Sequence, residues 1–141
     1  MEKYRFLPHT ADVMFEAFGN TVEELFENAA IALEETMVKT STVKQGQSYE
    51  ITLDSEDITD LLYDFLSELI FVKDTENLLF SRFGIVISHE NKEYKLFAKC
   101  EGEKINSEKH QLIDDAKAVT MHEFEVVQDN DKWYAKVIVD V

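Results

Sequence analysis

GNTVEELFENAAIALEETM, residues 19–37, decides the fold of this 141-residue chain, because it carries one long amphipathic pattern. Apolar residues recur there every three or four positions, as one face of an α-helix requires: Val22, Leu25, Phe26, Ala29, Ala30, Leu33 and Met37. Thr21 and Glu24 have the spacing of a capping box, in which a hydroxyl and a carboxylate bind free backbone amides at the helix start. The pattern predicts a helix over about residues 21–38.

A second helical pattern follows Ser55. Its apolar face consists of Ile58, Leu61, Leu62, Phe65, Leu66 and Leu69. Glu56 and Asp57 stand near its start, where the positive end of the helix dipole favours acidic side chains. We therefore predict a second helix over about residues 56–73.

The remaining segments alternate between apolar and polar residues, which is typical of strands with one buried face. The clear sets are Val13, Phe15 and Ala17; Tyr49, Ile51 and Leu53; Phe83, Ile85 and Ile87; Tyr94, Leu96, Ala98 and Cys100; and Trp133, Ala135, Val137 and Val139. Alternation is less regular from Val119 to Glu125. The links HENKE and QDNDK have the composition of hairpin turns, which favours antiparallel pairing.

These elements predict an α+β fold in a single domain over residues 1–141. Two helices cannot cover both faces of six or seven strands. The expected architecture is a two-layer sandwich with a mostly antiparallel sheet of six to seven strands and two main helices on one side. Residues 102–116, GEKINSEKHQLIDDA, fit neither pattern. A connection of this length is usually functional or disordered, and the sequence leaves both readings open.

Charge limits the partners that this chain can bind. It has 29 acidic residues against 14 Lys and Arg, and its formal net charge is −15. Such a field repels phosphate backbones, so direct nucleic-acid binding is not expected. It attracts cations and basic protein surfaces, which favours a metal site or a basic partner, with solubility alone as the alternative.

The compartment follows from cysteine usage and hydropathy. Cys100 is the single cysteine, which excludes an internal disulfide, and its alternation with core positions favours a buried hydrophobe over a nucleophile. The first residues, MEKYRF, show no signal-peptide pattern. No stretch approaches the ~20 apolar residues that span a bilayer. We therefore expect a cytoplasmic protein with no membrane role.

Two aspartates stand among apolar strand residues. Asp12, within FLPHTADV (residues 6–13), and Asp140, near the end of WYAKVIVDV, are both out of phase with the buried positions of their strands. An unpaired carboxylate is unfavourable in such surroundings, so each needs a cation, a donor or water. The α-carboxylate of Val141 would add a third acidic group. The three would favour a hard cation if the strands were adjacent, whereas separate strands would leave two exposed rim residues.

The histidines and their polar neighbours give weaker signals. His9 is a candidate ligand, base or backbone cap, and His89 and His110 lie in polar segments where solvation is expected. His122 stands near Lys117 and Thr120, which together form a polar set with catalytic potential. Trp133 is expected to pack in the core.

Sequence motifs give no positive sign of an enzyme. There is no glycine-rich phosphate loop, no Ser-His-Asp spacing and no His-x-x-x-His helix in the sequence. Its four glycines would make a nucleotide-cradling loop hard to build.

Three segments taken together resemble the archease family. They are LPHTADVMFEAFGNTVEELFENAAIAL, DAKAVTMHEFEV and the terminal WYAKVIVDV, which occur in the family's order across nearly the whole chain. The resemblance implies an accessory protein rather than an independent enzyme. Archeases assist the RNA-splicing ligase that joins tRNA halves, promoting guanylylation of the ligase and its multiple turnover.

The resemblance also implies a divalent-metal site (Ca, Mg or Mn). The family's metal aspartates fall on Asp12 and Asp140, with the terminal carboxylate of Val141 as a further ligand, and the family places the first and last strands side by side. His9, Thr10, Lys117, Thr120 and His122 are further candidates for partner contact. Met121 stands where the family usually has tyrosine, which affects partner recognition rather than the metal site.

Two other function classes remain as alternatives. A stand-alone metal-dependent phosphoesterase would also use clustered carboxylates, but would turn over substrate without a partner. A general chaperone-like module would need an exposed apolar patch and would act on unrelated proteins irrespective of metal.

Overall fold

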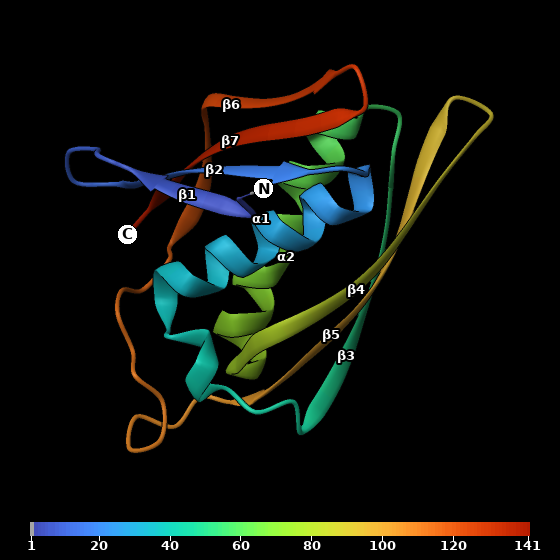
Figure 1. Cartoon of the computed structure of the whole chain (residues 1–141). Coiled ribbons are helices and arrows are strands. Elements are labelled where there is room, and N and C mark those ends of the chain that lie inside the picture. Colours follow the sequence, from blue (N-terminus) through green and yellow to red (C-terminus); the bar gives the residue numbers. More distant parts are fainter. Residues whose placement is uncertain (1) are drawn as a thin grey trace.

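The computed structural model describes residues 2–141, and two helices occupy its centre (Figure 1). Helix α1 spans Val22–Met37, as predicted to within a residue at each end. Helix α2 spans Ile58–Glu76, so it begins slightly later and ends three residues later than the sequence predicts. No helix within residues 2–141 is long and apolar enough to cross a membrane.

Side chains close the start of each helix. The Thr21 hydroxyl accepts a hydrogen bond from the backbone amide of Glu24 at 3.1 Å, and the Glu24 carboxylate accepts one from Asn20 at 3.3 Å. The predicted capping box is therefore present, with its return bond one residue earlier than usual. Asp57 caps α2, because its Oδ1 accepts from the amides of Thr59 at 2.7 Å and Asp60 at 3.3 Å.

Seven strands and a short 3₁₀ turn complete the structure of residues 2–141. They are β1 (Tyr4–Leu7), β2 (Val13–Gly19), the turn η1 (Thr40–Thr42), β3 (Gln47–Ser55), β4 (Leu78–Glu90), β5 (Glu93–Lys104), β6 (Ala118–Asp129) and β7 (Lys132–Asp140). All pairings between these strands are antiparallel. The predicted α+β class, strand number and two main helices are confirmed.

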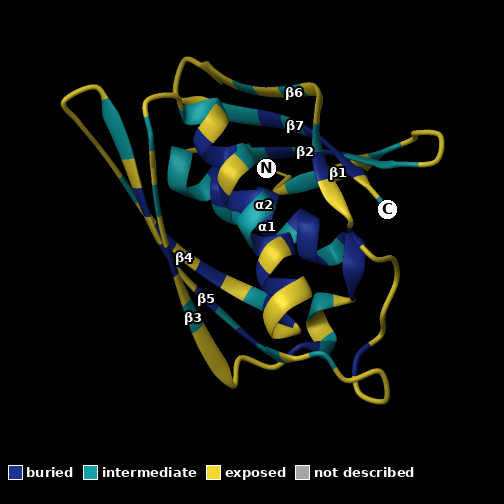
Figure 2. Ribbon diagram, turned by 180° about the vertical axis from the view of Figure 1, so that it is seen from behind, coloured by how far each residue is buried: buried dark blue, intermediate teal, exposed yellow. Residues whose placement is uncertain are grey.

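The strands divide into two sheets with the helices between them (Figure 1). One sheet has four strands in the order β1-β2-β7-β6, and the other has three in the order β3-β5-β4. Each sheet therefore has the helices on one of its faces only, and Figure 2 shows the buried residues gathered on these inner faces. The seven strands thus form two sheets where the sequence predicts one, because strand alternation indicates how many strands form but not which of them pair.

The core is a single cluster of side chains from both sheets and both helices. Its largest fully buried side chains include Phe15, Phe26, Phe65 and Phe80. Cys100 is fully buried, as predicted, and this burial raises the pKa of its thiol to about 12. Trp133 is half-buried and packs against the cluster.

Carboxylates of α1 bind the free edge of β4. In an edge strand, alternate backbone amides point away from the sheet and need acceptors elsewhere. Glu34 Oε1 accepts from the amide of Phe80 at 2.9 Å, and Glu27 Oε2 accepts from that of Ile85 at 3.2 Å. Glu23 makes a longer contact of the same kind with the amide of Ile87, at 3.4 Å. Helix α1 thus covers the edge of the three-stranded sheet with acceptors.

Glu34 is the most buried of these carboxyl groups, with 1% of its surface exposed. Its second oxygen, Oε2, has no hydrogen-bond partner within residues 2–141. Burial raises the pKa of Glu34 to about 8, although the bond from Phe80 acts in the opposite direction. The group is therefore mainly a neutral acid at pH 7.

The connection after β5 is ordered and tied to the end of α1. The amide of Lys39 donates to the carbonyl of Gln111 at 2.9 Å, and that of Ile113 donates to the carbonyl of Met37 at 2.8 Å. Leu112 forms an isolated β-bridge with Val38. Of the two readings that the sequence leaves open, disorder is therefore excluded.

His110 lies inside this connection, and the prediction that it is solvated is wrong. Its side chain is fully buried. Both ring nitrogens have partners inside the protein: Nδ1 accepts from the amide of Asn106 at 3.0 Å, and Nε2 lies 2.9 Å from Glu103 Oε2. Since a backbone amide can only donate, Nδ1 is unprotonated and Nε2 donates to Glu103. His89 is exposed, as predicted, and stacks on Tyr94 with the ring centroids 3.9 Å apart.

The raised pKa of Glu34 predicts how stability depends on pH. Between the unfolded value near 4.5 and the folded value near 8, the folded state binds more protons than the unfolded state, so stability falls as pH rises. We expect Glu34→Gln to remove this fall. Between pH 6 and 9 its free energy of unfolding should exceed that of the wild type by roughly a few kcal/mol. The measurement is thermal or urea unfolding across that range. Glu50→Gln, an exposed change on β3, is the control, and parallel pH curves for wild type and Glu34→Gln would contradict the assignment.

Candidate metal-binding tip

Strand pairing brings the two predicted metal aspartates to the same end of the four-stranded sheet. Val13 at the start of β2 pairs with Val139 near the end of β7. The same register, continued by one residue, sets Asp12 opposite Asp140. We call Asp12, Asp140 and the terminal Val141 the acidic tip.

Core packing determines which way the tip residues face. Val139 is buried in the core, and Val13 and Val141 pack against it. Because side chains alternate along an extended chain, Asp12 and Asp140 project to the outer face of the sheet. Asp12 is half-buried and Asp140 is exposed. Both carboxylates therefore lie on the solvent side of the same sheet end.

The start of β6 completes the tip. Ala118 pairs with Asp140, and the backbone amide of Lys117 donates to the carbonyl of Asp140 at 2.7 Å. This bond fixes the backbone next to the Asp140 carboxylate. Ends of three strands thus meet at one point, which is why residues from opposite ends of the chain lie together.

The β1–β2 connection, residues 8–12, leads into Asp12 through a strained position. Ala11 has φ 71°, in the left-handed region that residues with a side chain rarely adopt. Pro8, His9 and Thr10 precede it and are exposed. The connection thus presents His9 and Thr10 to solvent next to the tip.

The tip offers oxygen donors suited to a hard cation. Within residues 2–141 no three His, Cys, Asp or Glu side chains are grouped as metal ligands, so a site here would use two aspartates and the chain end. No basic side chain of the described residues forms an ion pair with Asp12 or Asp140. Carboxylate oxygens are the ligands that Ca²⁺ and Mg²⁺ prefer. The donor set fits such an ion.

A bulge in β6 brings His122 near a carboxylate. The β6–β7 register shifts between Thr120 and Glu125, and Glu123 within the bulge has φ 54°. Glu123 binds Lys136 Nζ at 3.1 Å and lies 3.5 Å from His122 Nε2. The bond to Lys136 lowers the pKa of Glu123. The irregular alternation from Val119 to Glu125 is the only sign of this bulge in the sequence.

Lys117 and Thr120 lie apart from these histidines. Lys117 is exposed and lines a groove against α2, whereas Thr120 pairs with Ile138 and its hydroxyl is buried without a partner in residues 2–141. The structure therefore pairs His122 with Glu123 and places Lys117 on the side of the sheet that faces the helices.

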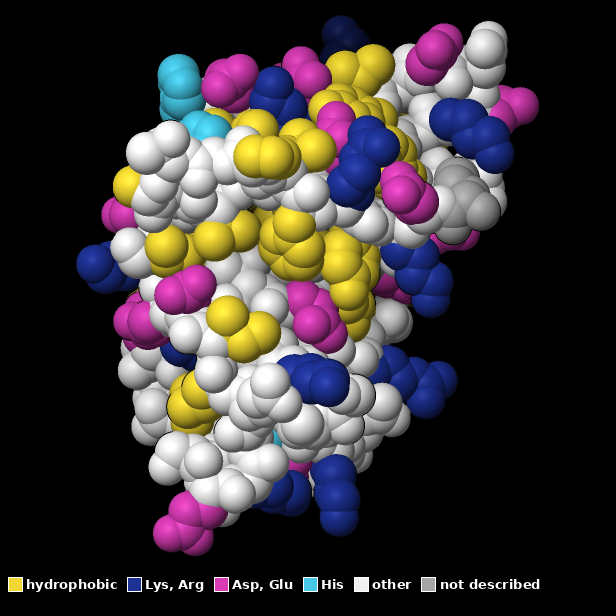
Figure 3. Space-filling model, turned by 60° about the vertical axis from the view of Figure 1, so that its left-hand side comes forward, with side chains coloured by type: hydrophobic (Ala, Val, Ile, Leu, Met, Phe, Trp, Pro, Cys, Tyr) yellow, Lys and Arg dark blue, Asp and Glu magenta, His cyan; other side chains and the backbone are white. Residues whose placement is uncertain are grey.

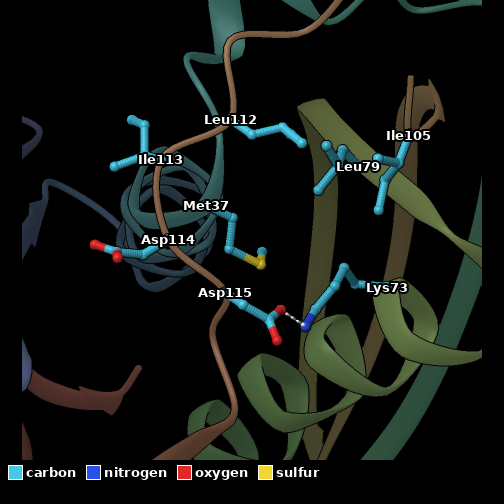
Figure 4. Close-up of a pocket in the computed structure, with 8 residues that line it drawn as sticks. All are labelled: Met37, Lys73, Leu79, Ile105, Leu112, Ile113, Asp114 and Asp115. Carbon is cyan, nitrogen blue, oxygen red and sulfur yellow. Dashed lines mark hydrogen bonds and ion pairs between the residues drawn. The ribbon is translucent and has the colours of Figure 1, made fainter. Parts of the chain in front are cut away.

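A buried lysine anchors the segment that leads into β6 (Figure 4). Lys73 is 6% exposed, and its ammonium binds Asp115 Oδ1 at 2.5 Å, Asp74 Oδ1 at 2.6 Å and the Ala116 carbonyl at 2.9 Å. With its hydrogen-bonding capacity filled, it is a structural anchor. Sequence reasoning missed it, because a lysine in the last turn of a helix is typical of a surface position.

Comparison with known proteins identifies the family of this chain. The Archease protein family model matches residues 4–141. The protein archease of Pyrococcus abyssi is 37% identical over 142 residues, which is 100% of both chains. The solution structure of Methanobacterium thermoautotrophicum protein 1598 matches with a TM-score of 0.89 and 40% identity over 100% of both chains. An archease crystal structure from Thermotoga maritima, described as a possible chaperone, matches with a TM-score of 0.64 and 25% identity, covering 96% of this chain and 94% of that one. This chain belongs to the archease family.

Proposed function

We propose that this archease is an accessory protein of an RNA-splicing ligase, that it promotes guanylylation of the ligase and its multiple turnover, and that it presents a divalent cation at the acidic tip. The observation that carries the proposal is the pairing of Val13 in β2 with Val139 in β7, the residues next to Asp12 and Asp140. Membership of the archease family supports a role in assisting another protein.

The residues of the tip have distinct tasks in this proposal. Asp12 and Asp140, with the terminal carboxylate of Val141, supply hard oxygen ligands for Ca²⁺, Mg²⁺ or Mn²⁺. A cation held there would supply positive charge that neutralises and orients nucleotide phosphates. The bond from the Lys117 amide to the Asp140 carbonyl keeps one of the two aspartates in place.

The charge of the whole chain supports this choice of partner. A net charge of −15 attracts a basic protein surface and speeds the first encounter with it. An enzyme that binds RNA carries such a surface around its active site. The acidic tip would therefore be drawn toward the cleft where guanylylation takes place, whereas free RNA would be repelled.

A general chaperone is the second candidate, and one observation favours it. Several large apolar side chains are exposed, among them Phe71, Ile113 and Met121. Exposed apolar surface is what a chaperone uses to bind unfolded chains. Such a protein would suppress aggregation of unrelated proteins without metal, whereas the ligase proposal predicts dependence on a divalent ion and on Asp12.

Neutralising either tip aspartate should abolish the effect on the ligase. We expect Asp12→Asn and Asp140→Asn each to lower stimulation of ligase guanylylation at least tenfold, because each removes a charged ligand of the cation. The measurement is transfer of labelled GMP from GTP to the ligase with Mg²⁺, Mn²⁺ or Ca²⁺ present. Asp131→Asn, an exposed change in the β6–β7 turn at the other end of the same strands, is the matched control. Full stimulation by both tip variants would refute the metal-tip mechanism.

Extending the chain beyond Val141 tests the third ligand. A Gly-Ser extension converts the terminal carboxylate into an amide, so we expect cation affinity measured by calorimetry to fall about tenfold or more. The unfolding temperature without metal should stay unchanged, since the side chain of Val141 keeps its packing against the core. Equal cation affinity with and without the extension would show that the terminal carboxylate is not a ligand.

A further inference from the structure

Two neighbouring grooves lie along the β5–β6 connection and the start of β6, close to the acidic tip. The connection groove, shown in Figure 4, has a volume of about 280 Å³ and is lined by Met37, Leu79, Ile105, Leu112 and Ile113 above Lys73. The helix groove, of about 250 Å³, lies between α2 and the start of β6, and its apolar lining includes Tyr63, Ile70, Phe71 and Val119.

The buried Lys73 joins the two grooves. Lys73 and Asp115 line the connection groove, and Asp74 lines the helix groove. The Lys73 ammonium binds both aspartates, so the two grooves share this polar junction. The two grooves are therefore neighbours, and we call them together the docking surface.

The docking surface carries large apolar side chains that remain in water. Phe71 is 58% exposed, Ile113 55% and Leu112 47%. Figure 3 views the molecule from the side of the connection and shows hydrophobic side chains in an interrupted band, with acidic side chains beside them. An apolar patch with a polar rim and grooves between its side chains is typical of a protein-binding site.

The rim of this surface is mainly acidic, with the exposed Lys117 at the end of the helix groove. Asp60 and Asp64 lie on the exposed face of α2 that also carries Phe71, and Asp114 and Asp115 follow Ile113 directly. Asp74 and Asp115 already neutralise Lys73, but the other aspartates have no ion-pair partner within the described residues. A complementary partner must therefore combine apolar side chains for the grooves with Lys or Arg for the rim.

The position of the helix groove relates the docking surface to the tip. Lys117 and Ala118 form the end of this groove. Ala118 pairs with Asp140, and the Lys117 amide binds the Asp140 carbonyl. A protein segment that fills the helix groove therefore ends next to the acidic tip.

We propose that the docking surface binds a basic amphipathic segment of the partner protein, with apolar side chains of that segment packed around Phe71 and Ile113. This inference rests on the proposed function, since the partner is the ligase. It assigns binding of the ligase and presentation of the cation to two different sets of residues. The metal site then lies beside the contact rather than within it.

The test compares exposed apolar residues inside and outside the docking surface. We expect Phe71→Glu and Ile113→Glu each to weaken binding to the intact ligase at least tenfold in calorimetry, because each places a carboxylate in an apolar contact. Phe97→Glu is the matched control, since Phe97 is 42% exposed but lies on the outer face of the three-stranded sheet. Affinity for the cation should be unchanged in all three variants, and Asp12→Asn should still bind the ligase while failing to stimulate it.

Each outcome has a defined consequence. Loss of binding in Phe71→Glu and Ile113→Glu but not in Phe97→Glu supports the docking surface. Unchanged binding in Phe71→Glu and Ile113→Glu overturns it and leaves the proposed function intact. A wild-type protein that neither binds nor stimulates the ligase overturns both. Asp64→Lys adds a charge test, in which binding must weaken and depend less on salt if the partner segment is basic.

Discussion

The polar contact between α1 and both sheets is the constraint on which the rest of the structure depends. The two open sheets share no strand, and the helices pack between them. Asn28 of α1 donates to the carbonyl of Phe18 in β2 at 2.6 Å, while Glu34 and Glu27 of the same helix accept from amides of β4. These bonds are directional, unlike apolar packing, and they therefore select one position of α1.

The position of α1 also determines where β2 lies, and β2 begins directly after Asp12 of the acidic tip. Gly19 at the end of β2 allows the first turn of α1 to approach closely, since a Cβ there would lie 2.4 Å from the amide nitrogen of Leu25. Phe15 and Ala17 bury their side chains in the same core. The helix therefore holds β2 in place, and β2 holds Asp12 in register with Asp140. The proposed site, which combines residues from both ends of the chain, would thus depend on a helix that contributes no ligand to it.

The sequence predicts the local elements well because each leaves a periodic signal. The apolar stripes from Val22 to Met37 and from Ile58 to Leu69 are buried, and the alternating sets form strands. Pairing between strands leaves no such signal, so the division into two sheets and the β6 bulge near His122 do not follow from it. The proximity of Asp12 to Asp140 likewise came from resemblance to a family. The burial of His110 does not follow from the sequence either, because its partner Glu103 is on β5, in a contact that composition does not reveal.

An accessory protein that supports many turnovers must bind its partner and then leave it. Large apolar interfaces form stable complexes, whereas a small surface with an acidic rim favours rapid association and moderate affinity. The two grooves, of about 280 and 250 Å³ beside exposed aspartates, form a small surface of this latter kind. The acidic surplus then has a kinetic purpose, because it speeds the encounter without adding much apolar contact that would slow release. In the proposed function, Asp12 and Asp140 lie beside this surface instead of inside it, so a cation held there would act on the partner while binding stays weak enough to reverse.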